Sequence, residues 1–360
     1  LRRMIAREQV IQQANQKQMI NVEISNNELI GKLESLKALQ QSLLNDYNKC
    51  VKEIKETMQS IPSDSKEFET MQDIANLSNN YYAEEFNNIN ETINLADKIL
   101  KFNELLHKKT SQKGFSRIAG YDNIKQILED KFIKPINSLK KDNKQEFPNI
   151  ILFYGPKGCG KTLFTNALID EVQCNTINIE LTLNSEKDFN NLQNAIKKSK
   201  SLYTEKGLYT IIRIDELDGF ISDKSFKADE LQKLIKSLNQ ECCTIVATTN
   251  YPNNVNNNIL NNIGVEKFYI EPPVKKNIQE VLKYYIEGFV HSNINYQSLA
   301  EILQKKTNNN FFSNAKIAES IIYSLKEILM DTDETLNQEY FENIMNKIKP
   351  DIDKSTIKYI

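Results

Sequence analysis

Residues 155–162, which read Gly-Pro-Lys-Gly-Cys-Gly-Lys-Thr, restrict the possible folds more than any other segment of this chain. An apolar segment, residues 150–154, precedes them, and a helical pattern over residues 163–169 follows them. The order of strand, glycine-rich turn, Lys-Thr and helix is typical of a phosphate-binding loop. The glycines let the backbone bend until successive N–H groups point inward, and the helix N-terminus adds the positive end of its dipole. The segment therefore predicts an α/β fold with a phosphate site at this turn.

The side chains of this loop suit a nucleoside triphosphate bound together with a metal ion. Lys161 would reach the β- and γ-phosphates, and the hydroxyl of Thr162 would hold Mg²⁺. A glycine-rich turn that arises by chance is the alternative, and the agreement of the loop with both flanks argues against it. The other nucleotide contacts that we expect from this segment are Gly155, Pro156, Lys157, Gly158, Cys159, Gly160 and Leu163.

A second apolar strand, residues 209–214, ends in two carboxylates, Asp215 and Glu216. Ligands of a parallel α/β sheet bind at the carboxyl ends of its strands, so both side chains would lie beside the loop. Asp215 would hold Mg²⁺ through water, and Glu216 would polarise an attacking water at the γ-phosphate. A solvated acidic turn is the alternative, and the loop upstream favours the functional interpretation. Asn250, after the strand at 244–249, would bond the γ-phosphate or the water, although asparagine there is usually only a turn residue.

Composition excludes several classes of protein. The chain has 360 residues, enough for two or three domains, and its formal net charge of −2 gives no basic excess for nucleic acid. No segment approaches the roughly 18 consecutive apolar residues of a membrane span. Five irregularly spaced cysteines, one of them in the loop, favour a reducing, cytoplasmic location. The alternative is a membrane tether through a missing segment upstream of Leu1, because Arg2, Arg3 and Arg7 could form its positive flank.

The first 110 residues predict long helices. They contain one glycine, Gly31, and one proline, Pro62, and their apolar residues recur at near-heptad spacing. Residues 61–65 break the pattern, because proline cannot continue a helix and serine or aspartate can cap the next one. We therefore expect a helical hairpin or coiled coil that pairs with itself or with another subunit, and a protein partner that binds these helices.

The pattern changes after a polar linker at residues 108–114. Short apolar segments then alternate with helices, which indicates a doubly wound parallel sheet, and only helical patterns follow Lys276. The expected strands are residues 149–154, 175–181, 208–214, 243–248 and 267–270. The expected later helices are residues 278–290, 296–305, 315–330 and 337–348. The expected domains are a helical hairpin or coiled coil at 1–112, a nucleotide-binding α/β domain at 113–272, a helical lid at 273–348 and a tail at 349–360.

Together these motifs resemble the AAA family of ATPases. The resemblance covers about residues 113–345 and rests on the order and spacing of five motifs. It implies an α/β P-loop NTPase with a C-terminal helical lid, ATP and Mg²⁺ as ligands, and a hexameric ring. The motifs are the N-terminal signature at 115–122, Walker A at 155–162, Walker B at 211–216, sensor 1 at 247–250 and the lid segment at 307–317.

The resemblance also implies roles for individual residues. Ile118, Ala119 and Gly120 would contact adenine through their backbone, and Asn314 would contact the nucleotide from the lid. The chain departs from the family in this lid segment, because the family has Gly at the position of Asn314 and Asp at the position of Lys316.

Two further departures concern hydrolysis and polypeptide threading. The family ends its second homology region with two arginines, whose places Asn261 and Gly264 occupy here. No arginine follows Arg213, and an arginine finger contributes roughly 10³–10⁵ in rate, so hydrolysis by this chain alone should be slow. The polar residues 183–189 replace the pore loop of threading members, which argues against threading. We interpret Phe189 as a core residue rather than a substitute pore aromatic.

Three functions remain open on these grounds. The first is an ATPase that uses Lys161, Glu216 and Asn250 as catalytic residues and remodels a protein partner or assembly. The second is a nucleotide-gated binding module with weak or absent hydrolysis, which the missing arginines favour. The third is a coiled-coil scaffold whose ATPase domain sets the oligomeric state. The intact loop and carboxylates favour the first, acting in a homo- or hetero-oligomer.

Overall fold

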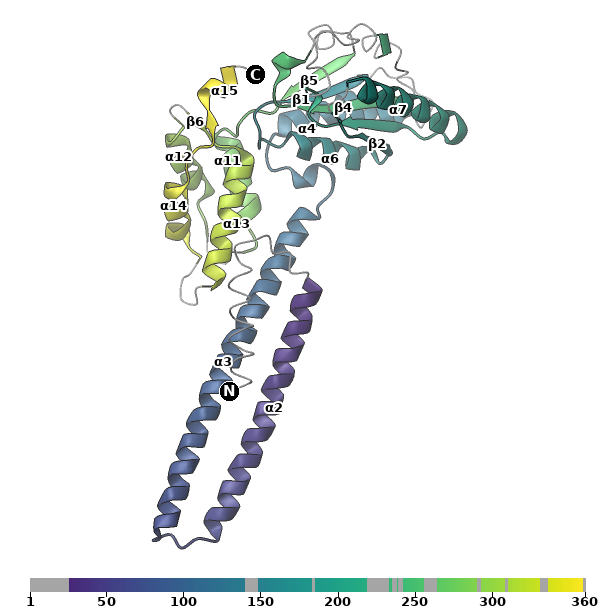
Figure 1. Ribbon diagram of the computed structural model, residues 1–360. Coiled ribbons are helices and arrows are strands. Elements are labelled where there is room, and N and C mark those ends of the chain that lie inside the picture. The colour runs from purple at the N-terminus through teal and green to yellow at the C-terminus, as the bar shows by residue number, and fades with distance from the viewer. Residues whose placement is uncertain are drawn as a thin grey trace. The chain divides into compact units, whose positions relative to one another are not determined.

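The chain divides into two compact units, Leu1–Leu106 and His107–Ile360 (Figure 1). Two long helices occupy the described part of the first unit, and a sheet with helices forms the second. None of the helices in the described ranges has both the length and the apolar character needed to cross a bilayer. The computed structural model describes residues 26–139, 148–182, 185–218, 233–234, 238, 242–255, 264–289, 293–307, 310–330 and 336–358.

The first unit contains the expected helical hairpin. Helix α2 (Asn26–Gln59) and helix α3 (Lys66–Thr110) are joined by the short turn that contains Pro62. The hydroxyl of Ser65 accepts a hydrogen bond from the backbone N–H of Phe68 at 3.2 Å and so caps the start of α3. The helices bury part of their apolar stripes against each other, which confirms the prediction of a long-helix pair. The buried residues of this contact are Leu29, Leu33, Ile89, Ile93 and Ala96.

A five-stranded parallel sheet with the order β2-β3-β4-β1-β5 forms the centre of the second unit. Strand β4 lies between β1 and β3, with Tyr154 opposite Thr249 and Ile214 opposite Ala247. The turns that follow β1 and β3 therefore emerge at the same edge of the sheet, on either side of β4. The strands are β1 (Ile150–Tyr154), β2 (Asn175–Ile179), β3 (Thr210–Ile214), β4 (Cys243–Thr249) and β5 (Val265–Tyr269).

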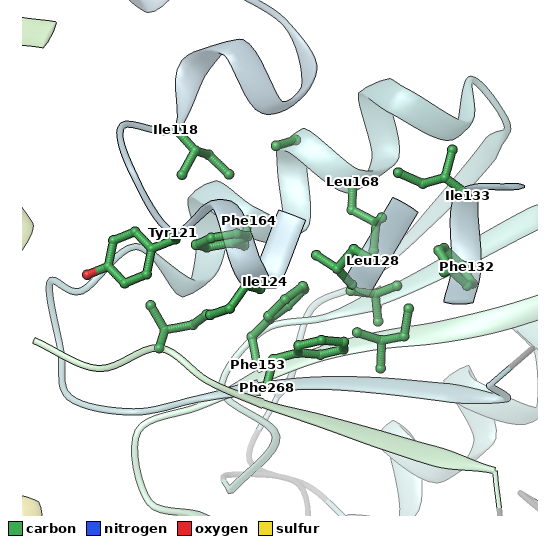
Figure 2. Close-up of a cluster of buried hydrophobic side chains, with 14 of the residues drawn as sticks. Ile118, Tyr121, Ile124, Leu128, Phe132, Ile133, Phe153, Phe164, Leu168 and Phe268 are labelled. Carbon is green, nitrogen blue, oxygen red and sulfur yellow. The ribbon is translucent and has the colours of Figure 1, made fainter. Parts of the chain in front are cut away.

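Alternate side chains of each strand pack against helices on opposite faces of the sheet. Ile151 and Phe153 of β1 share a core with Phe164 of α6 (Lys161–Val172), as the close-up in Figure 2 shows for the two phenylalanines. Ile150 and Leu152 lie in the second core, which α7 (Ser185–Lys206) covers. Helices on both faces confirm the doubly wound α/β fold. The α6 face is completed by η2 (Gly114–Arg117), α4 (Asp122–Leu128), the π-turn η3 (Glu129–Ile133) and α5 (Lys134–Leu139).

A helical lid follows the sheet. It contains α11 (Lys275–Ile286), α12 (Tyr296–Lys305), α13 (Asn314–Met330) and α14 (Gln338–Lys347). Strands β6 (Asn310–Phe311) and β7 (Ile352–Asp353) pair antiparallel, and α15 (Lys354–Lys358) follows β7. Ile352 is buried in the same core as Phe153 of β1. The segment that we expected as a tail thus contains a strand and a short helix that pack on the rest of the unit.

Candidate functional site

The turn after β1 curls so tightly that it depends on glycine. Gly155, Gly158 and Gly160 have φ of 141°, 80° and 107°, values that other residues rarely adopt. A Cβ on Gly155 would also clash with the carbonyl oxygen of Ile270, directly after β5. The loop therefore lies close against the backbone of the neighbouring strand, and this approach fixes where its remaining residues point.

Lys161 begins α6 and is enclosed by the loop. Its side chain is 7% exposed, and Nζ donates hydrogen bonds to the carbonyl oxygens of Gly155 at 2.8 Å and Pro156 at 2.7 Å. Burial lowers the pKa of Lys161, while nearby acidic groups act in the opposite direction. Thr162, the next residue, is exposed. A largely buried ammonium group at a helix N-terminus is thus available to an anionic ligand of the loop.

Asp215 and Glu216 follow β3 and are held by two side chains. Thr248 of β4 donates from Oγ1 to Oδ1 of Asp215 at 3.1 Å and accepts from the backbone N–H of Glu216 at 3.2 Å. Arg213 donates from Nε to Oδ2 of Asp215 at 3.0 Å, and from Nη2 to the same oxygen. Glu216 has a φ of 56°, which is uncommon outside glycine, and its side chain is exposed. The neighbouring strand therefore helps to orient both acidic residues.

Asn250 follows β4 and so lies at the same edge of the sheet. The hydroxyl of Thr249, the last residue of β4, donates to the carboxylate of Asp218 and accepts from the backbone N–H of Tyr251 at 3.0 Å. These bonds flank Asn250 and connect its turn to the residues after β3. The structure thus places the three predicted turns, after β1, β3 and β4, together at one edge of the sheet.

The start of α13 contacts the phosphate loop directly. The backbone N–H of Ala315 donates to the carbonyl oxygen of Gly158 at 3.0 Å. Nδ2 of Asn314 donates to the carbonyl oxygen of Cys159 and to the hydroxyl of Tyr121, both at 2.8 Å. Oδ1 of Asn314 is buried and has no hydrogen-bond partner within the described residues. The lid residue predicted from the sequence is therefore in contact with the loop.

Residues 118–120 reach the same region and are anchored to the lid through Tyr121. Gly120 has a φ of 72°, and a Cβ there would lie 2.8 Å from Oδ1 of Asn277 in α11. That oxygen accepts from the backbone N–H of Tyr121 at 3.2 Å, while the Tyr121 hydroxyl donates to the carbonyl oxygen of Glu271 at 2.9 Å. Burial raises the pKa of Tyr121, so its hydroxyl keeps its proton. Tyr121 and Asn277 belong to the site. Our sequence analysis included Tyr121 in the N-terminal signature without giving it a role, and it did not identify Asn277.

A family model covers the sheet and its loops. Residues 151–270 match the model named AAA, which describes the ATPase family associated with various cellular activities. The chain contains an AAA domain.

Known proteins resemble this chain over the AAA domain and part of its flanks. The outer mitochondrial transmembrane helix translocase of Homo sapiens is 26% identical over 243 residues, which cover 62% of this chain and 65% of that protein. Cell division protein C of Sulfolobus acidocaldarius is 22% identical over 272 residues, which cover 71% of this chain and 72% of that protein. A solved katanin chain, described as the structural basis for katanin self-assembly, has a TM-score of 0.50 and 19% identity, and covers 70% of this chain and 90% of its own. The chain thus spans 65% of the translocase, and the katanin chain shows a shared fold.

A cavity of about 300 Å³ lies where the loop of the AAA domain meets the residues after α14. Asp351 accepts hydrogen bonds from the backbone N–H of Ser313 at 2.7 Å and from its hydroxyl at 2.6 Å. Lys157 of the loop and Lys316 of α13 both line the cavity. Its size is near the lower limit for small-molecule sites. Asp351 is a further residue at this site that had no signal in the sequence, because it lies in the segment that we expected as a tail.

The positions where the AAA family carries arginines are only partly described. Asn261 lies outside the described residues, and Gly264, directly before β5, has a φ of 92°. Of the segment that replaces the pore loop, residues 183 and 184 also lie outside the described residues. Phe189 is 4% exposed and belongs to the core under α7, so it occupies a structural position in the AAA domain.

The oxygen atoms at the edge of the AAA domain suit Mg²⁺. The hydroxyl of Thr162 and the carboxylate of Asp215 are hard donors, and Mg²⁺ is commonly bound by one or two such groups with phosphate oxygens and water. A guanidinium cation already contacts Asp215, so this carboxylate can bind positive charge where it stands. Within the described ranges, no group of three or more His, Cys, Asp and Glu side chains could hold a metal ion. Thr162 and Asp215 have the donor chemistry that Mg²⁺ bound together with a nucleotide would need.

Proposed function

We propose that this chain binds ATP with Mg²⁺ and hydrolyses the ATP, and that hydrolysis remodels a protein partner or assembly. The observation that carries this proposal is the burial of Lys161 in a glycine loop at the sheet edge where Asp215 and Glu216 also emerge. The AAA domain supports the use of a nucleotide. The proposed nucleotide contacts remain the loop residues 155–163, the segment 118–120 and Asn314.

The proposed residues have distinct roles in phosphoryl transfer to water. Lys161 and the N–H groups of the loop would neutralise charge as the γ-phosphate departs. Thr162 and Asp215 would hold Mg²⁺, which supplies positive charge to the phosphate oxygens when bound. Glu216 would polarise the attacking water, and Asn250 would orient it. Thr248 would support this step, because it contacts both Asp215 and Glu216.

Turnover by this chain alone is proposed to be slow, and a neighbouring subunit would accelerate it. The chain has no arginine after Arg213, and Lys267 of β5 offers a point charge instead of a planar fork. A different subunit that contributes an arginine would raise the rate by roughly 10³–10⁵. We propose a homo- or hetero-oligomer, hexameric by resemblance to the family. The self-assembly described for the katanin chain supports an oligomer.

The partner is proposed to be a protein that binds the hairpin of α2 and α3. The relatives named as transmembrane helix translocases act, by that name, on a protein segment, which supports a protein partner over nucleic acid. We propose a cytoplasmic location. A membrane tether through a segment upstream of Leu1 is the alternative, and the outer mitochondrial location in the names of these relatives supports it.

A nucleotide-gated binding module is the second candidate. The hydrogen bonds of Asn314 and Ala315 to the loop favour it, because a ligand in the loop would act on the lid without any hydrolysis. A coiled-coil scaffold is the third, and it fails if Lys161→Ala leaves assembly intact but abolishes the biological output.

A steady-state ATPase assay on the full chain, with and without candidate partners, tests the main proposal. Glu216→Gln should retain binding of a fluorescent ATP analogue and lose turnover by about 10²-fold or more. Glu205→Gln, at an exposed position of α7, is the matched control and should leave turnover unchanged. If Glu216→Gln leaves turnover unchanged, hydrolysis at this site is refuted. If wild-type chain binds the analogue without any turnover, the gated module replaces the ATPase.

A further inference from the structure

Arg213 places a guanidinium group on the carboxylate that is proposed to hold the metal ion. Nε and Nη2 both donate to Oδ2 of Asp215, and Nη1 donates to the side-chain oxygen of Asn166 in α6 at 2.7 Å. All three nitrogen atoms of the group are therefore engaged. The Arg213 side chain is 22% exposed and that of Asp215 is 38% exposed, so the cation is the more enclosed partner.

This arrangement follows from the alternation of side chains along β3. Side chains two residues apart in a strand point to the same face of the sheet. Arg213 and Asp215 therefore share a face with Ile211, which belongs to the core under α6. Arg213 is the only residue of β3 that is not fully buried. Its guanidinium reaches both Asn166 on the covering helix and the carboxylate at the strand end. It cannot leave Asp215 by rotation alone without disturbing the bond to Asn166.

The contact has a consequence for any divalent cation at this edge. Oδ1 of Asp215 already accepts from Thr248, and Oδ2 accepts twice from Arg213, so both oxygens have partners. Mg²⁺ demands near-ideal octahedral geometry and would place a second, divalent cation beside the guanidinium. Two cations that share one carboxylate weaken each other's binding. An ion that coordinates Oδ2 directly must therefore displace the Arg213 bonds, whereas an ion that binds Asp215 through water leaves them in place.

We propose that Arg213 is a positioning residue that shares Asp215 with the divalent cation, so that exchange between guanidinium and ion sets the Mg²⁺ requirement of the nucleotide site. This inference rests on the proposed ATP-binding function. At low Mg²⁺ concentration, Arg213 keeps Asp215 oriented toward β4. As the Mg²⁺ concentration rises, the ion takes over this carboxylate, and the chain moves from metal-free to metal-loaded nucleotide binding.

Binding of a fluorescent ATP analogue to the full chain, titrated with Mg²⁺, tests this exchange without a turnover measurement. Arg213→Gln removes the charge of the guanidinium. The Mg²⁺ concentration that gives half of its maximal effect on analogue binding should then fall about three- to tenfold. Arg213→Lys retains the charge and should stay closer to wild type. Electron paramagnetic resonance can measure the binding of Mn²⁺ directly. The affinities for Mn²⁺ should rank the variants in the same order as the Mg²⁺ titrations. Lys200→Gln removes an exposed lysine of α7 and is the control for net charge.

The outcomes separate this inference from the proposed function. Analogue binding that is intact in every variant, with the same Mg²⁺ requirement in Arg213→Gln and wild type, overturns the role of Arg213 and leaves ATP binding standing. Failure of the wild-type chain to bind the analogue overturns both. If Arg213→Gln does not fold, Asn166→Ala releases Nη1 alone and should lower the Mg²⁺ requirement by a smaller factor. An unchanged requirement in Asn166→Ala then refutes the exchange.

Discussion

Nδ2 of Asn314 lies 2.8 Å from the carbonyl oxygen of Cys159 and donates a hydrogen bond to it. Asn314 is the first residue of α13 in the lid, and Cys159 lies in the middle of the phosphate loop. A ligand that changes the loop therefore acts on the lid through a direct contact. The same amide group also binds Tyr121, so the segment that precedes α4 belongs to this junction.

Asn314→Gly should accelerate nucleotide release. The change removes both hydrogen bonds of Nδ2, each with a net contribution of about 0.5–1.5 kcal/mol, and it also removes the unpartnered Oδ1, which offsets part of the loss. We expect dissociation of a fluorescent ADP analogue to be about three- to tenfold faster. Asn343→Ala, at an exposed position of α14, is the control. An unchanged dissociation rate in Asn314→Gly would show that the lid does not retain the nucleotide.

Thr248→Val should reduce turnover more than binding. The hydroxyl of Thr248 orients Asp215 and accepts from the backbone N–H of Glu216, and valine has the same shape without these bonds. Loss of about 1–1.5 kcal/mol in the transition state corresponds to about a tenfold lower kcat. Single-turnover hydrolysis and analogue binding measure the two effects separately. Thr248→Ser keeps the hydroxyl and should retain most of the rate, and an equal loss in both variants would contradict the role of the hydroxyl.

Cys159 should resist alkylation although it lies in the phosphate loop. Burial raises the pKa of its thiol to about 12, so almost no thiolate is present near neutral pH. The thiols of Cys50 and Cys174 are less buried and should react first. Brief treatment with N-ethylmaleimide, followed by mass spectrometry of peptides, gives the order. All five cysteines should react after unfolding in urea, and native labelling of Cys159 as fast as that of Cys174 would refute the prediction.

Lys161 should make the unfolding free energy rise with pH on the alkaline side. Burial lowers the pKa of Lys161 in the folded chain below its ordinary value of 10.5. Between the folded pKa and 10.5, the unfolded chain binds more protons than the folded chain, so stability increases with pH in this window. Lys161→Met removes the titrating group. The difference in unfolding free energy, wild type minus Lys161→Met, should therefore increase through the window, and a flat difference would contradict the burial effect.

Local patterns predicted the elements of the fold because each element has a period that the sequence displays. The helical spacing before Pro62 corresponds to α2. The strands expected at 149–154 and 208–214 correspond to β1 at Ile150–Tyr154 and β3 at Thr210–Ile214. The last of the expected strands, 267–270, lies at Val265–Tyr269, a shift of the size usual for short strands. The strand order β2-β3-β4-β1-β5 carries no local signal, since it depends on contacts between distant segments.

The candidate site also combines features with a local sequence pattern and features that depend on contacts between distant segments. Motifs of consecutive residues identified the loop and the carboxylates, and their positions at one sheet edge follow from the parallel order. Asn277 and Asp351 contribute through tertiary contacts, so no nearby residue pointed to them. Thr248 lies within the sensor 1 segment, but its contact with Asp215 is also tertiary and has no local signal. Arg213 is the exception, because its spacing of two residues from Asp215 in a strand already places both side chains on one side.

The pairing of β6 with β7 determines how this protein should be labelled for experiments. The backbone N–H of Asp351 donates to the carbonyl oxygen of Phe311 at 3.1 Å, and Ile352 is buried in the core of the sheet. An affinity tag or fluorophore joined behind α15 would therefore sit a few residues from a segment that lines the loop cavity. Such a probe would report on the nucleotide state, and it would also perturb that state. Measurements of affinity are best made on chains without it.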